Sequence, residues 1–190
     1  RHKARTWAVP GNHEYVTANA TPYFAYFGAR AGDPDKGYYS FDLGAWHILS
    51  LNSNASAQPG SPQYEWLRQD LERGTGPCAL AYWHHPVFSS GPHGNNPHMG
   101  EIWRLLDLAG VDVVLVGHEH SYERFAPQDA DGRPDADGIR QFVVGTGGVS
   151  LRPFSAVHPN SEARNSDTFG VLTLALHALT YEWEFVPVDG

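Results

Sequence analysis

The sequence predicts an α/β fold built around parallel strands. A short apolar run rich in β-branched residues, 113–116, is typical of a strand buried on both faces. A second apolar run, 78–83, precedes it, and a helical segment at about 97–109 lies between the two. This strand–helix–strand order predicts a βαβ unit. Near the C-terminus, 169–176 and 180–186 alternate apolar and polar residues, which predicts an antiparallel hairpin.

The remaining elements follow from local signals along the chain. Ser61 and Pro62 form a typical helix start, Leu67 and Leu71 lie on one helical face, and Gly74 ends the helix. The other expected elements are a short strand at 6–10, one or two helical turns within 22–27, a turn at 33–37, a hairpin of 38–41 and 46–51, and a strand at 139–144.

Composition excludes several classes of function. The 190 residues suit one domain, and the net charge of -8, without a basic cluster, argues against a nucleic-acid footprint. No apolar run approaches the ~20 residues of a membrane span, so no membrane association is expected. Cys78 is the only cysteine, which rules out an intrachain disulfide and a thiolate metal cluster.

Candidate ligands follow three of the expected strands. Asn12 and His13 follow the strand at 6–10, His84 follows that at 78–83, and His118 and His120 follow that at 113–116. In an extended chain, residues i and i+2 point to the same side, and sites in α/β sheets form at the carboxyl edge. A lone His-x-His also fits two ordinary loop histidines, but three such strand ends favour a metal site. Oxygen and imidazole ligands suit Zn, Mn or Fe.

Glycines at 145–148 follow the strand at 139–144. They resemble a phosphate-binding loop, but no helix follows them, so a P-loop is not expected. We expect instead that these glycines let the backbone pass close to the site.

Three motifs in this order carry a family resemblance: Gly-Asn-His-Glu at 11–14, His-x-Pro at 84–86 and Gly-His-x-His at 117–120. Together they resemble the calcineurin-like metallophosphoesterase superfamily. The continuations at 121–124 and 88–93 are similar to the purple acid phosphatases. The resemblance implies an α/β/β/α sandwich of mixed sheets and two metal ions, either Fe, Zn or Mn.

The resemblance also implies roles for individual residues. Asn12, His84 and His118 would bind one metal and His120 the other, while His13 and His93 would face the phosphate, His13 as proton donor or charge stabiliser. Glu14 would orient its loop, and residues 122–124 would brace the site. His85 fits either a contact behind the ligands or simple packing.

Five histidines receive a structural or solvated interpretation: His2, His47, His98, His158 and His177. For His158 the alternative is a place in the lining of the cleft.

One part of the family pattern is absent from the sequence. An Asp-bearing strand and a Gly-Asp motif, which supplies the bridging carboxylate, should precede 11–14, where the chain has only ten residues. We therefore expect 1–190 to be the C-terminal two-thirds or so of a single metallophosphoesterase domain without its first strands. We expect it to pair with another chain or with the missing N-terminal segment.

The expected function is hydrolysis of small phosphomonoesters by metal-activated water, in the full-length protein and not necessarily in this chain alone. The alternatives are a phosphodiesterase of the same superfamily and a truncated, non-catalytic module that binds metal or a partner. The sequence does not determine the compartment, and the resemblance favours a secreted or extracytoplasmic enzyme.

Overall fold

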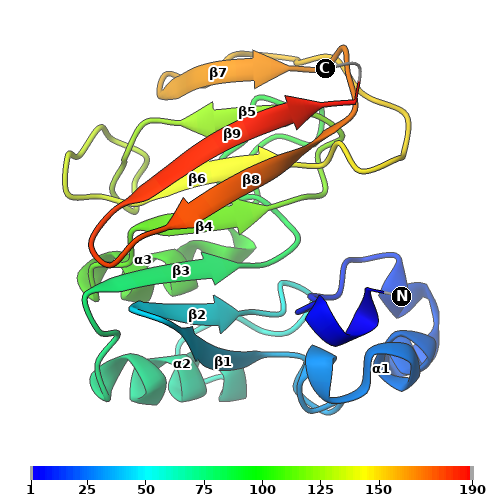
Figure 1. The fold of residues 1–190 in the computed structure, drawn as a ribbon, viewed down its shortest axis with the longest axis vertical. Helices are drawn as coiled ribbons and strands as arrows, with labels where there is room; N and C mark the ends of the chain where they lie inside the picture. Colours follow the sequence, from blue (N-terminus) through cyan, green and yellow to red (C-terminus); the bar gives the residue numbers. More distant parts are fainter. Residues whose placement is uncertain (1, 189–190) are drawn as a thin grey trace.

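The structure, a computed structural model, describes residues 2–188 and has one large mixed sheet with helices on one face and a β-hairpin on the other (Figure 1). The helices are α1 (Thr21–Phe27), α2 (Pro62–Glu72) and α3 (Gly100–Leu108). The strands are β1 (Tyr39–Leu43), β2 (Trp46–Ser50), β3 (Cys78–Tyr82), β4 (Val113–Val116), β5 (Tyr122–Phe125), β6 (Arg140–Val144), β7 (Ser161–Asn165), β8 (Gly170–Leu176) and β9 (Tyr181–Pro187). Five short 3₁₀ turns lie at Lys3–Arg5, Glu14–Val16, Ala18–Ala20, Gly28–Ala31 and Pro97–Met99. None of the helices within residues 2–188 has the length and apolarity needed to cross a bilayer.

The large sheet has the strand order β1-β2-β3-β4-β6-β5-β7. Strands β2, β3, β4 and β6 are parallel, and β1, β5 and β7 pair antiparallel to their neighbours. The carboxyl ends of the four parallel strands therefore meet at one edge, and the loops that follow them come together there. The predicted α/β fold with mixed sheets is confirmed, and the described residues supply its helix, sheet and hairpin layers.

Helices α2 and α3 cover one face of the sheet. Leu67 of α2 and Trp103 of α3 are fully buried against small residues of β3 such as Ala79 and Ala81, which let the helices approach closely. The α2 start is as predicted, because the Ser61 hydroxyl accepts a hydrogen bond from a backbone N–H in the first turn.

The predicted C-terminal hairpin, β8 and β9, covers the other face (Figure 1). Phe142 of β6 is fully buried and meets the ring of Trp183 edge to face, with 5.7 Å between centroids. Tyr122 of β5 stacks on Phe185 at 4.4 Å. These aromatic contacts fix the hairpin over β5 and β6, towards one side of the large sheet.

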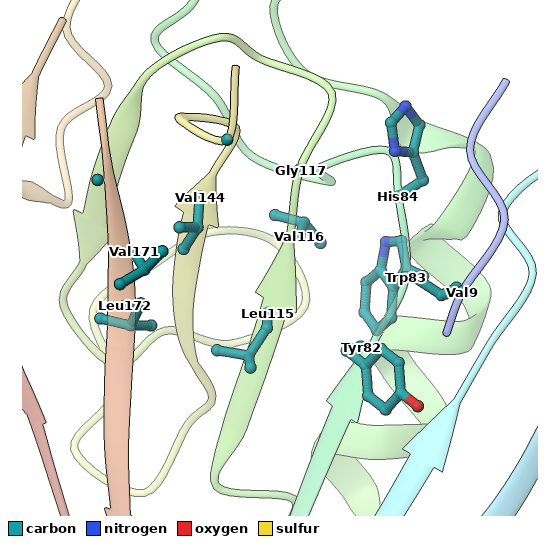
Figure 2. Close-up of a pocket in the computed structure, with 12 residues that line it drawn as sticks. Val9, Tyr82, Trp83, His84, Leu115, Val116, Gly117, Val144, Val171 and Leu172 are labelled. Carbon is teal, nitrogen blue, oxygen red and sulfur yellow. The ribbon is translucent and has the colours of Figure 1, made fainter. Parts of the chain in front are cut away.

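The hairpin leaves an apolar groove beside it. A cavity of about 410 Å³ lies between β8 and the β3–β4 part of the sheet, with His84 at one end (Figure 2). Tyr82, Leu115, Val144 and Leu172 are among its lining residues. Within residues 2–188, β8 pairs with β9 alone, so its other edge faces this groove without a strand partner.

The structure differs from the sequence-based expectations at three strand positions: one expected strand is absent, and two strands are present where none was expected. Residues 6–10 form no strand, because no neighbouring strand pairs with them. Instead, Ala8 N–H bonds to Arg30 O, and the Tyr39 hydroxyl donates to Ala8 O at 2.8 Å. Conversely, β5 and β7 are strands that were not expected from the sequence. Their charged residues interrupt the alternation of apolar and polar residues that predicts a strand.

Candidate metal centre

Three potential metal ligands from distant parts of the chain meet at the carboxyl edge of the sheet. His84 follows β3 and His118 follows β4, and the His84 Nε2 atom lies 3.1 Å from His118 Nδ1. The same Nε2 atom lies 2.9 Å from Asn12 Oδ1. An amide oxygen and a second imidazole nitrogen therefore both lie within 3.1 Å of His84 Nε2, which is the grouping that the motif order predicts.

The loop that carries Asn12 is shaped for this close approach. A Cβ atom at Gly11 would lie 2.9 Å from the His84 ring, so a side chain at this position would displace the ring. The Glu14 carboxylate accepts a hydrogen bond from the Gly11 N–H at 2.7 Å. Glu14 thus contacts its own loop backbone, which is the contact expected of a residue that orients the loop.

The chain at His118 is not extended, so the expectation that His118 and His120 project from one side of an extended strand end is wrong. Strand β4 ends at Val116, and His118 adopts a left-handed conformation with φ of 66°. Hydrogen bonds from Glu119 N to Gly117 O and from Ser121 N to Glu119 O close two tight turns. Both rings nevertheless line one cavity of about 560 Å³. Left-handed backbone outside glycine is uncommon and concentrates at functional sites.

The loop after β6 holds His120 from behind. His120 Nδ1 donates to Ser150 O at 3.0 Å, which leaves Nε2 as the free ring nitrogen. Arg152 N–H bonds to the His120 carbonyl at 3.0 Å. The two backbone segments can approach this closely because residue 145 is a glycine. A Cβ atom at Gly145 would lie 1.7 Å from the Glu119 carbonyl oxygen. The expected close backbone passage is therefore present at Gly145.

Burial keeps the central imidazoles neutral. It lowers the pKa of His84 to about 3, with further lowering by the nearby His85 and His118. Burial also lowers the pKa of His118 to about 4, again assisted by neighbouring histidines. Neutral imidazole is the form that binds a metal, so both rings are ready to ligate at pH 7.

His85 makes specific contacts instead of only filling space. Its Nδ1 atom lies 2.8 Å from the Ser53 hydroxyl, and its ring is centred 4.5 Å from that of His118. Ring nitrogens of His84, His85 and His118 all lie within 4.8 Å of one another. His85 thus packs beside the rings of both His84 and His118.

The two histidines expected to face the substrate both line the cavity. His13 is exposed at the start of a 3₁₀ turn. The His93 ring is centred 4.5 Å from that of His118, and its Nδ1 atom lies 3.0 Å from Glu119 Oε1. The structure therefore brings all six candidate site residues to one cavity wall.

Sequence reasoning missed two residues at this site, Glu119 against the His93 ring and Arg152 on the cavity wall. Glu119, between the two histidines of the third motif, is fully buried and accepts hydrogen bonds from both the backbone and the ring of His93. Arg152 lines the cavity from the loop after β6. The sequence does hold one signal for Arg152. It follows the glycines at the end of β6, and the carboxyl end of β6 lies at the same edge of the sheet as those of β3 and β4.

Histidines outside the cavity have other partners. His47 lies between the Asp42 and Asp70 carboxylates, at 2.7 and 2.8 Å. His158 packs between aromatic rings and does not line the cavity. Residues 122–124 lie in β5, where the buried Glu123 carboxylate accepts the Ser90 N–H at 2.9 Å and so holds the loop that leads to His93.

The donor set fits a metal ion. One amide oxygen and two neutral imidazoles can bind Zn, Mn or Fe, and His120 offers a further nitrogen. Among residues 2–188, the carboxylate that lines the cavity is Glu14, which is engaged by the Gly11 N–H. The described residues thus fit one metal ion, with His120 as a further nitrogen donor at the cavity.

Comparisons with known proteins agree with this geometry. Residues 1–122 match the calcineurin-like phosphoesterase family. A probable purple acid phosphatase 20 of Arabidopsis thaliana is 34% identical over 76% of this chain and 38% of its own length. The human acid phosphatase type 7 is 32% identical over 62% of this chain and 32% of its own length.

A solved structure shares the fold. The purple acid phosphatase PPD1 from yellow lupin seeds superposes with a TM-score of 0.79 at 22% sequence identity, covering 95% of this chain and 36% of the lupin chain. The present chain therefore spans less than half the length of these relatives. From the family match and the assembled motifs, the chain belongs to the calcineurin-like phosphoesterase family.

Proposed function

We propose that the full-length protein hydrolyses phosphate monoesters at a dinuclear metal centre, of which this chain provides one wall. The observation that carries the proposal is the convergence of Asn12 Oδ1, His84 Nε2 and His118 Nδ1. When bound, two metal ions supply a water of lowered pKa and positive charge for the phosphoryl oxygens. Asn12, His84 and His118 would hold one ion, and His120 would contribute to the other.

The neighbouring residues have separate roles: His120 offers a ring nitrogen to a metal, His13 donates a proton, and Glu14 positions the loop. The Ser150 carbonyl fixes the His120 ring so that its Nε2 atom is available to a metal. His13 is exposed at the cavity wall and can donate a proton to the leaving oxygen of the ester. Glu14 keeps the loop that carries both Asn12 and His13 in place through Gly11.

The test of this proposal is hydrolysis of an aryl phosphate by the full-length protein and by its His13→Ala variant. Loss of a general acid typically costs ~10²-fold or more in rate, so kcat should fall by about that factor with metal content unchanged. His177→Ala is the matched control, because its exposed ring lies beside the β8–β9 turn and away from the cavity.

An unchanged rate in His13→Ala would remove His13 from the mechanism. Faster hydrolysis of a diester than of a monoester by the wild type would favour the phosphodiesterase alternative. A metal-loaded full-length protein that hydrolyses neither ester would favour a non-catalytic, metal-binding module.

We also propose that the groove beside β8 is filled by a strand from the preceding part of the longer protein. Its apolar lining and the unpartnered edge of β8 support this occupant, as does the chain's short span relative to its relatives. The isolated 190-residue chain should therefore self-associate or aggregate. Sedimentation of that chain as a stable, monodisperse monomer would contradict the proposal.

A further inference from the structure

Arg152 holds a position in the cavity that the metal ligands and the proton donor do not explain. It lies in the loop after β6, and its backbone N–H bonds to the His120 carbonyl at 3.0 Å. The neighbouring Ser150 carbonyl accepts from the His120 ring. These two contacts hold the loop against the Gly-His-x-His motif. The Cα atom of Arg152 is therefore fixed relative to His118 and His120.

The guanidinium of Arg152 lies against the imidazole of His93. Its Nη1 atom lies 2.9 Å from His93 Nε2 and 3.4 Å from His93 Nδ1, while Glu119 Oε1 is 3.0 Å from His93 Nδ1. The Glu119 carboxylate can only accept, so it accepts from the His93 Nδ1–H, and the guanidinium lies against the ring, close to both of its nitrogens. A fixed row of Glu119, His93 and Arg152 results, with the buried carboxylate at one end and the cation at the cavity.

The charge of Arg152 is available to a ligand. Within residues 2–188, no carboxylate lies within 4.0 Å of its guanidinium, whereas Arg68, Arg104 and Arg140 all have such partners. Among those residues, Arg152 is also the one Lys or Arg that lines the cavity. A guanidinium has five N–H donors in a planar fork that matches phosphate oxygens, so most of its donors remain to be used.

We propose that Arg152 is a substrate-contacting residue that binds a non-bridging phosphate oxygen beside His93 and favours dianionic phosphomonoesters over monoanionic diesters. The inference rests on the proposed hydrolase function and adds a substrate preference to it. A monoester presents a second charged oxygen where a diester presents an esterified one. Arg152 therefore gains a charge-assisted hydrogen bond with the monoester that the diester cannot match.

The experiment compares full-length wild type with Arg152→Ala and with Arg152→Gln, which removes the charge but keeps an amide donor and most of the length. The kcat/KM for an aryl phosphate monoester should fall about 10- to 100-fold, the usual value of a hydrogen bond to a charged group, and that for a bis-aryl phosphate less than about 3-fold. The inhibition constant of inorganic phosphate should rise by a factor similar to the monoester loss.

Arg133→Ala is the control, because it removes the same charge from an exposed loop outside the cavity. It should leave both esters and inorganic phosphate unaffected. An equal effect of Arg133→Ala and Arg152→Ala would show that only net charge matters and would overturn the assignment.

Two further outcomes would overturn it. Equal losses for monoester and diester in both Arg152 variants would mean that the residue acts only through His93. A loss of bound metal or of thermal stability in both variants would mean that it only supports the His120 loop.

Failure of the proposed function would look different. In that case the wild type hydrolyses neither ester, and calorimetric titration with inorganic phosphate still tests whether Arg152 binds the anion. Weaker phosphate binding in the Arg152 variants than in Arg133→Ala would support the assignment, and equal binding would refute it.

Discussion

The contact between Gly145 and the Glu119 carbonyl gives the sharpest prediction about how the site is built. A Cβ atom at Gly145 would lie 1.7 Å from that oxygen and 2.6 Å from the Glu119 carbonyl carbon. Both are backbone atoms, so no side-chain rotation can relieve the overlap. Gly145→Ala must therefore move one backbone segment by more than 1 Å to restore a normal contact of at least 3.0 Å.

Gly145→Ala should lower both the stability of the protein and its affinity for metal. Overpacking in well-packed regions costs about 1–3 kcal/mol, and a clash between two backbone segments belongs at the upper end. A domain of this size loses roughly 2–4 °C in Tm per kcal/mol, so the Tm should fall by about 4–12 °C. Because the displaced carbonyl lies between His118 and His120, metal affinity should fall by ~10- to 100-fold as well.

Gly147→Ala is a matched control in the same loop. A Cβ atom there meets nothing within 4 Å, and neither Gly145 nor Gly147 has a positive φ, so backbone strain does not separate the two variants. Thermal unfolding and metal titration of the full-length protein measure both effects. Equal Tm and equal metal affinity in the two variants would refute the close-approach argument.

Two further predictions concern stability. Burial lowers the pKa of His47, but hydrogen bonds to Asp42 and Asp70 raise it by more, so the net shift is upward. Protonated His47 therefore stabilises the folded state. This stabilisation is fully present below the unfolded-state pKa of ~6.5 and is lost as pH rises through the folded-state pKa. His47→Gln should therefore lower the free energy of unfolding more at pH 6 than at pH 9. A cost independent of pH would exclude this linkage. Phe142→Ala should cost about 3–5 kcal/mol in urea unfolding, because the ring is fully buried between sheet and hairpin, whereas Leu179→Ala, exposed by 75% in the β8–β9 turn, should stay within about 0.5 kcal/mol. Similar values for the two variants would mean that the hairpin does not pack on the sheet as described.

The sequence predicted the elements whose patterns are set locally. Apolar runs marked β3 and β4, and Ser61 with Pro62 marked the start of α2, because burial and capping leave direct traces in residue type. Strand β5 was missed because Glu123 is a charged residue that is buried only through its bonds to Ser90 and Ser161. Partners so distant in the chain leave no periodic pattern.

The site was predictable as a set of residues but not as a geometry. Motif order brought Asn12, His84 and His118 together correctly, yet the extended-chain argument failed at His118, whose left-handed turn depends on the loop packed against it. Arg152 was missed for the same reason, since only the folded loop shows that it contacts His93. Local sequence reveals the types of candidate ligand, and tertiary contacts decide the orientation of their side chains.

Metal content per chain tests the central claim most directly, measured by elemental analysis on the full-length protein, its His118→Ala variant and the His177→Ala control. About two metal ions per chain are predicted in the wild type and the control, and at least one fewer in His118→Ala, because His118 contributes one of three convergent donors. Equal metal content in all three proteins would contradict the assignment of this edge of the sheet as a metal centre.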